Sequence, residues 1–174
     1  MGLDDMLGAG DQQALAAARE KLARSVKSGA NWFYWIAGLS LVNSVVHLTG
    51  GGLNFIVGLG ITQVVDAIAA GVAQGTTGPL VGAARAFAIV LDVVAAGVFA
   101  LLGRQANKQR SWAFGVGMVL YTLDGLIFVV AQDWLSLAFH AFALYGIWSG
   151  YSSLKKLASV EIAHGLRPTG PGAG

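Results

Sequence analysis

The sequence predicts an all-α fold: a polytopic membrane helix bundle of about five transmembrane helices, preceded by a short amphipathic N-terminal helix. Three observations lead to this fold class. Hydrophobic residues make up 55% of the 174, while charged residues make up only 11%, compared with roughly 25% in soluble domains. Five apolar runs follow one another, each close to the ~20 residues that cross ~30 Å of hydrocarbon. Eleven of the 25 glycines lie inside these runs, and glycine is more frequent in membrane helices than in soluble ones.

Residues 1–30 are predicted to form a soluble or interfacial segment. Asp11 is suited to cap the N-terminus of a helix, and Gly29 is suited to end it. Between them an apolar stripe alternates with basic residues, which is typical of an amphipathic helix that lies on a membrane surface or against a bundle. The stripe consists of Leu15, Ala18, Leu22 and Val26.

The bundle itself is expected over residues 31–151. The five runs cover about 32–48, 53–73, 80–102, 112–131 and 134–151. The first run opens with the aromatic cluster Trp32-Phe33-Tyr34-Trp35, as expected at a membrane–water interface. Gly146 and Gly150 form a small-xxx-small pattern, which favours close packing of helices within the chain over oligomerisation. Residues 152–174 are expected to be a polar, partly disordered tail.

The number of spans decides where the basic residues lie. Five spans divide them almost evenly between the two sides, so the positive-inside rule gives no orientation. A four-span alternative, in which Gly50–Gly52 belongs to a broken or re-entrant element, places the basic segments on one side.

Ionisable residues inside the apolar runs are the candidate functional residues. An ionised side chain at the centre of a membrane helix costs at least ~2.5–3.5 kcal/mol, so such groups face the bundle interior and need partners. From the rise of about 1.5 Å per residue, most of them are expected in two adjacent layers of the bundle. The candidate ion or proton site comprises Asp66, Asp92, Asp124, Arg85 and His140, with Asn43, Gln63 and His47 as supporting polar residues.

Two interpretations of this set remain open. In one, the polar residues form a buried network that fixes helix register, with Arg85 paired to one or two aspartates and His140 to another. In the other, the surplus of carboxylates binds a proton or a cation.

Other chemistries find little support. The chain has no cysteine, which excludes disulfides and cysteine-based metal sites, and no metal site is predicted. Catalytic and nucleotide-binding motifs are missing, so an enzyme is not expected. The pair Ser136 and His140 has the i, i+4 spacing of a dyad but lacks an oxyanion loop. No cofactor is expected, and a haem or pigment held by His47 or His140 is the one alternative.

The expected function is a small multi-pass integral membrane protein that acts as a structural or interaction subunit, or scaffold, of a membrane assembly. The alternative is a proton- or cation-coupled transporter or channel that uses the intramembrane aspartates. The expected partners are the lipid bilayer and other copies of the chain or other membrane subunits. Nucleic acid is not expected, because the basic residues are not interleaved with aromatic ones. The sequence does not indicate which membrane the protein occupies.

Overall fold

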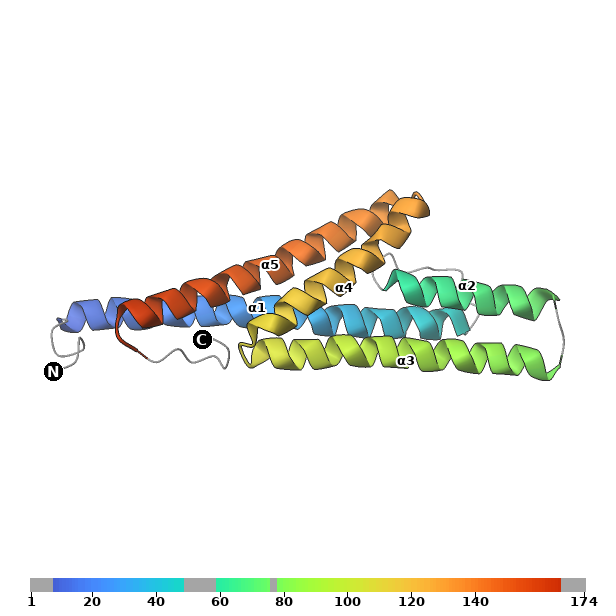
Figure 1. Ribbon diagram of the computed structural model, residues 1–174, viewed down its shortest axis with the longest axis horizontal. Helices are drawn as coiled ribbons and strands as arrows, with labels where there is room; N and C mark the ends of the chain where they lie inside the picture. The colour runs from blue at the N-terminus through green and yellow to red at the C-terminus, as the bar shows by residue number, and fades with distance from the viewer. Residues whose placement is uncertain (1–7, 49–58, 76–77, 167–174) are drawn as a thin grey trace.

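A computed structural model describes residues 8–48, 59–75 and 78–166, and the described part is all-α (Figure 1). It contains five helices, which are α1 (Ala9–Leu48), α2 (Gly60–Gly75), α3 (Pro79–Asn107), α4 (Ser111–Val130) and α5 (Trp134–Ala163). The predicted fold class is therefore confirmed as all-α. Two helices, α3 and α4, are long and apolar enough to cross a membrane.

Helix α1 is a single helix of 40 residues, so the predicted helix end at Gly29 is wrong. Gly29 serves a different purpose, because α1 and α5 cross there at a very short distance. A Cβ added to Gly29 would lie 2.5 Å from the Cα of Gly150, and one added to Gly146 would overlap the Trp32 ring. The prediction that the Gly146/Gly150 pattern packs helices within the chain is confirmed.

Helix α5 continues to Ala163, so the predicted boundary at residue 151 is also wrong. The last three turns are helical because their buried side chains, among them Leu154 and Leu157, pack on the first half of α1. Polar contacts join the same two segments: Arg19 forms an ion pair with buried Glu161 at 2.9 Å, and Ser153 donates to Ser25 at 2.8 Å. Residues 167–174, expected to be disordered, lie outside the described residues.

The core of the bundle centres on Phe33, which is fully buried. Its ring packs against Phe99 of α3 and Phe114 of α4, and it occupies the space left by the missing side chains of Gly103 and Gly117. Of the predicted interfacial cluster, Trp35 is exposed while Phe33 belongs to this core. The turn between α3 and α4 therefore lies level with the middle of α1.

The helices alternate in direction, except at one point (Figure 1). Helices α1 and α2 point the same way, α3 returns beside both, and α4 and α5 form an antiparallel hairpin that packs on α1. Helix α2 begins at Gly60 rather than at residue 53, and residues 53–58 of the predicted run lie outside the described residues. Its start lies inside the bundle, which makes its N-terminus the focus of the site described below.

The α1–α5 crossing is tested by replacing Gly29 with alanine. The added Cβ meets backbone atoms of Gly150 that cannot move without separating the helices, so we expect the Gly29→Ala variant to lose about 1–3 kcal/mol of stability. Thermal unfolding of the purified protein in detergent measures this. Gly38→Ala is the matched control on the same helix, because nothing lies within 4 Å of its added Cβ. Equal stability of the two variants would contradict the close crossing.

Candidate functional site: an aspartate that caps a buried helix start

The candidate site is built around the N-terminus of α2. The first N–H groups of a helix have no partner within the helix, and they carry a partial positive charge. Water satisfies them at a protein surface, but in an apolar interior they need acceptors from side chains. Leu59 and Gly60 are both buried, so their N–H groups need such acceptors.

Two other helices supply these acceptors. Asp124 of α4 accepts from Gly60 N–H at 2.7 Å through Oδ2 and from Ile61 N–H at 2.9 Å through Oδ1. Ser40 of α1 accepts from Leu59 N–H at 2.9 Å, while its own hydroxyl donates to the Ile36 carbonyl. The carboxylate thus acts as the cap of a helix to which it does not belong.

The approach of α2 to α4 requires glycine. A Cβ at Gly60 would lie 2.8 Å from the Phe128 ring and 3.2 Å from the Asp124 carbonyl oxygen. Gly60 is the first residue of α2, so the missing side chain lies at the point where this helix meets α4.

His140 of α5 completes the site, and its contacts fix its protons. Its Nδ1 lies 2.9 Å from the Ser136 carbonyl oxygen, which can only accept, so Nδ1 carries a hydrogen. Its Nε2 lies 3.0 Å from Asp124 Oδ2. That contact needs a proton on one of the two groups, either imidazolium beside carboxylate or neutral imidazole beside carboxylic acid. In both cases the pair has no net charge, which suits a buried position.

Aromatic rings enclose the imidazole. Tyr121 stacks on His140 with ring centroids 4.2 Å apart, and Phe128 packs against it at 4.9 Å. A Cβ at Gly125 would come within 3.3 Å of the imidazole, so this glycine also allows the close contact. His140 is 1% exposed and Asp124 7%, and the pair is therefore almost completely removed from solvent.

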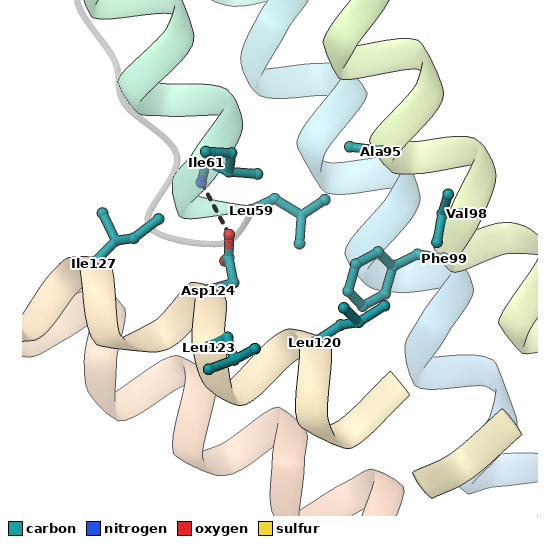
Figure 2. A pocket seen from close by; sticks show the side chains of 9 residues that line it. All are labelled: Leu59, Ile61, Ala95, Val98, Phe99, Leu120, Leu123, Asp124 and Ile127. Atoms are coloured by element: carbon teal, nitrogen blue, oxygen red, sulfur yellow. Dashed lines mark hydrogen bonds between the residues drawn. The ribbon is translucent and has the colours of Figure 1, made fainter. Parts of the chain in front are cut away.

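An apolar groove of about 350 Å³ reaches one side of Asp124 (Figure 2). Figure 2 shows the carboxylate directed toward the backbone nitrogen of Ile61, with the groove extending between the start of α2, α3 and α4. Asp124 is the one ionisable residue among those that line it. The other eight lining residues are Leu59, Ile61, Ala95, Val98, Phe99, Leu120, Leu123 and Ile127.

The remaining candidates do not all join this site. Asp92 is buried on α3, and Asn43 is buried on the neighbouring helix α1, whereas Asp66 and Gln63 are partly exposed on α2. Within the described residues, no three histidine or acidic side chains form a group that could hold a metal ion. The side chain of His47 lies outside what the structure describes.

The expected interior position of Arg85 is wrong. Arg85 is exposed, and no ion pair joins it to an aspartate within the described residues. It lies only six residues after Pro79, in the second turn of α3, where a long side chain can extend toward the end of the bundle. The partner of Asp124 is His140, in agreement with the expectation that His140 pairs with one of the aspartates.

The contacts of His140 bear on two alternatives from the sequence, a dyad with Ser136 and a ligand to a haem or pigment. The Ser136 hydroxyl donates to Asp133 at 2.6 Å rather than facing the imidazole, so the two residues do not form a dyad. Both ring nitrogens of His140 are already engaged, which leaves none directed at a haem or pigment.

Comparisons with known proteins add no further information about the site. No protein-family model, curated protein or solved structure matches the chain. The interpretation of the site therefore depends on its geometry.

The capping role of Asp124 predicts a local effect of the Asp124→Asn variant. The amide cannot accept from Gly60, Ile61 and His140 as the carboxylate does, and a buried N–H left without a partner costs about 1–3 kcal/mol. We expect reduced stability together with faster amide exchange at Gly60 and Ile61, measured by hydrogen–deuterium exchange. Asp11→Asn, at an exposed position in the first turn of α1, is the control. Unchanged exchange at the start of α2 would exclude the capping role.

A second prediction concerns Asp133, which caps α5 at the α4–α5 turn. Hydrogen bonds from the Ser136 hydroxyl and from the Ser136 backbone N–H lower the pKa of Asp133 below its ordinary value of 3.8. This cap therefore stabilises the fold above that ordinary value, and its contribution is lost as the pH falls through the lowered pKa. The carbon chemical shift of the Asp133 carboxyl group should titrate with a midpoint below pH 3.8. In Ser136→Ala the midpoint should rise, and an unchanged midpoint would contradict the assigned cause.

Proposed function

We propose that this chain is a small multi-pass integral membrane protein that serves as a structural or interaction subunit of a membrane assembly. The apolar outer surface supports the membrane location. Large hydrophobic side chains are exposed along α3, α4 and the first half of α5, and Val130, Phe142 and Tyr145 are each more than half exposed. An aqueous protein rarely exposes an apolar surface of this extent, whereas lipid accommodates it.

Four crossings fit the fold better than five. The second half of α1, α3, α4 and α5 alternate in direction (Figure 1). Helix α2 has 16 residues and is therefore about 24 Å long, and it starts inside the bundle rather than at a surface. This arrangement agrees with the four-span alternative, in which a broken element follows the first span.

The observation that carries the structural role is the state of Asp124. Its carboxylate accepts from two backbone N–H groups and contacts His140, and the pair is enclosed by aromatic rings. A group that holds three helices together in this way acts as part of the framework. The framework in turn presents the exposed faces of α3 and α4 to lipid and to partner subunits.

One observation favours the alternative, a proton-coupled transporter or channel. The contact between Asp124 and His140 requires one proton more than an ionised aspartate and a neutral histidine carry together, and the groove reaches Asp124. The groove is lined mainly by apolar side chains, however, and this supports closure to water rather than a conducting path.

Purification from native membranes tests the structural role. A tagged chain solubilised in a mild detergent should elute together with partner subunits as an assembly larger than the monomer. The same sample in a denaturing detergent should release the chain alone, which controls for aggregation. Elution as a stable monomer without partners would contradict the proposal. The alternative instead requires pH-dependent flux in proteoliposomes, which substitution of the Asp124–His140 pair should abolish.

A further inference from the structure

The basic residues gather at one end of the described molecule. Of the eleven Lys and Arg residues in the chain, ten lie in the described part, and nine of these belong to three segments that the fold brings together. We call these nine the basic end. They are Arg19, Lys21, Arg24 and Lys27 of α1, Arg104, Lys108 and Arg110 around the α3–α4 turn, and Lys155 and Lys156 of α5.

Contacts between helices place the three segments at the same end. The Arg19–Glu161 ion pair and the Ser25–Ser153 hydrogen bond hold the second half of α5 against the first half of α1. The α3–α4 turn joins them because the helix ends on both sides of it pack on Phe33, about 9 Å along α1 from Lys27. The opposite end holds Asp133 at the α4–α5 turn and the tenth cation, Arg85.

A belt of exposed aromatic residues lies beside the basic end. Trp35 is 64% exposed close to Phe33, Trp112 is 51% exposed two residues after Arg110, and Trp148 is 55% exposed next to the α1–α5 crossing. Indole rings favour the headgroup level of a bilayer. The belt therefore indicates the depth of one membrane surface, and the cations of the basic end lie at this depth or beyond it.

We propose that the basic end binds the anionic phospholipid headgroups of the cytoplasmic leaflet, with both ends of the described chain on the cytoplasmic side. This inference depends on the membrane location proposed above. Positive charge near the ends of spanning helices is retained on the cytoplasmic side, and that leaflet carries the anionic lipid that attracts it. Five cations lie nearest the aromatic belt and are assigned to the headgroups, namely Lys27, Arg104, Lys108, Arg110 and Lys155.

The charges around this end support an anionic ligand. Three acidic residues lie in the described part of the same end, and two of them are already paired, Glu161 with Arg19 and Glu20 with Arg24. The five cations assigned to the headgroups take no part in those ion pairs, and Lys155 lies over the Tyr151 ring at 4.9 Å. The third acidic residue, Asp11, lies in the first turn of α1, far from the belt.

Lipid titration tests the headgroup assignment. The delipidated protein in neutral detergent is titrated with phosphatidylglycerol or with phosphatidylcholine, and binding is followed by tryptophan fluorescence. We expect at least tenfold tighter binding of phosphatidylglycerol, and we expect this preference to weaken as ionic strength rises. The triple variant Arg104→Gln, Lys108→Gln, Arg110→Gln should lose most of the preference. Arg85→Gln, at the opposite end, is the matched control and should keep it.

The outcomes are separable. Equal binding of the two lipids by the wild-type protein, or an equal loss in the Arg85→Gln control, would overturn the headgroup assignment. If the triple variant unfolds in detergent, the single variant Lys108→Gln, at an exposed turn position, replaces it and should weaken phosphatidylglycerol binding about threefold. Capture of an acidic protein by the basic end without any lipid preference would also reject the proposal.

Cysteine labelling tests the orientation, because the chain has no cysteine of its own. In intact cells a membrane-impermeant maleimide should label Gln132→Cys at the α4–α5 turn. It should label Asn107→Cys, beside the basic end, only after permeabilisation. Labelling of Asn107→Cys from outside would reverse the orientation and reject this inference while leaving the membrane location standing. Release of the protein from membranes by alkaline carbonate would instead reject the proposed function on which it depends.

Discussion

The fold depends on one electrostatic requirement, which is that the buried N-terminus of α2 must find hydrogen-bond acceptors. Backbone N–H groups without partners are too costly to leave in an apolar interior. The carboxylate of Asp124 and the hydroxyl of Ser40 meet this requirement from α4 and α1. Both acceptors belong to other helices. The hydrogen bonds that these N–H groups donate therefore fix the position of α2 against the bundle. The glycines at positions 60 and 125 follow from the same requirement, since larger residues would keep the helices apart.

The sequence predicted the helices whose ends coincide with changes in polarity. The runs 80–102 and 112–131 correspond to α3 and α4, because basic and polar residues bound them in the sequence. The predictions were wrong where a residue that is typical of a helix end or a tail instead contributes to packing between helices. From its sequence neighbours alone, Gly29 is expected to end a helix, but in the fold its missing side chain provides space for α5. The segment after residue 151 reads as a tail because it is polar, yet its buried side chains pack on α1. Both errors arise because partners distant in sequence override a local signal.

The candidate site was predictable only in part, for the same reason. Similar depth along two helices was enough to pair His140 with an aspartate, because depth follows from residue counts and helix rise. Depth could not show that α2 begins at Gly60 or that Asp124 caps it, since the capping residue lies 64 positions away. Nor could it show that Arg85 is exposed, because that depends on which part of α3 the neighbouring helices cover. Thr62, whose hydroxyl donates to the Leu59 carbonyl, was the one local sign of a helix start.

The cap also constrains any role for Asp124 in moving protons. The carboxylate accepts from α2 while it shares one proton with His140, so the pair is neutral and the helix start is satisfied at the same time. A second proton would give a hydrogen to both the carboxyl group and Nε2 of His140, so the carboxyl group would present a donor where α2 and His140 then both need acceptors. Binding of a second proton would therefore weaken the hydrogen bonds at the start of α2. Because a hydrogen on the Asp124 carboxylate would disturb the cap of this helix, a structural role accounts for the residue with fewer requirements than a transport role does.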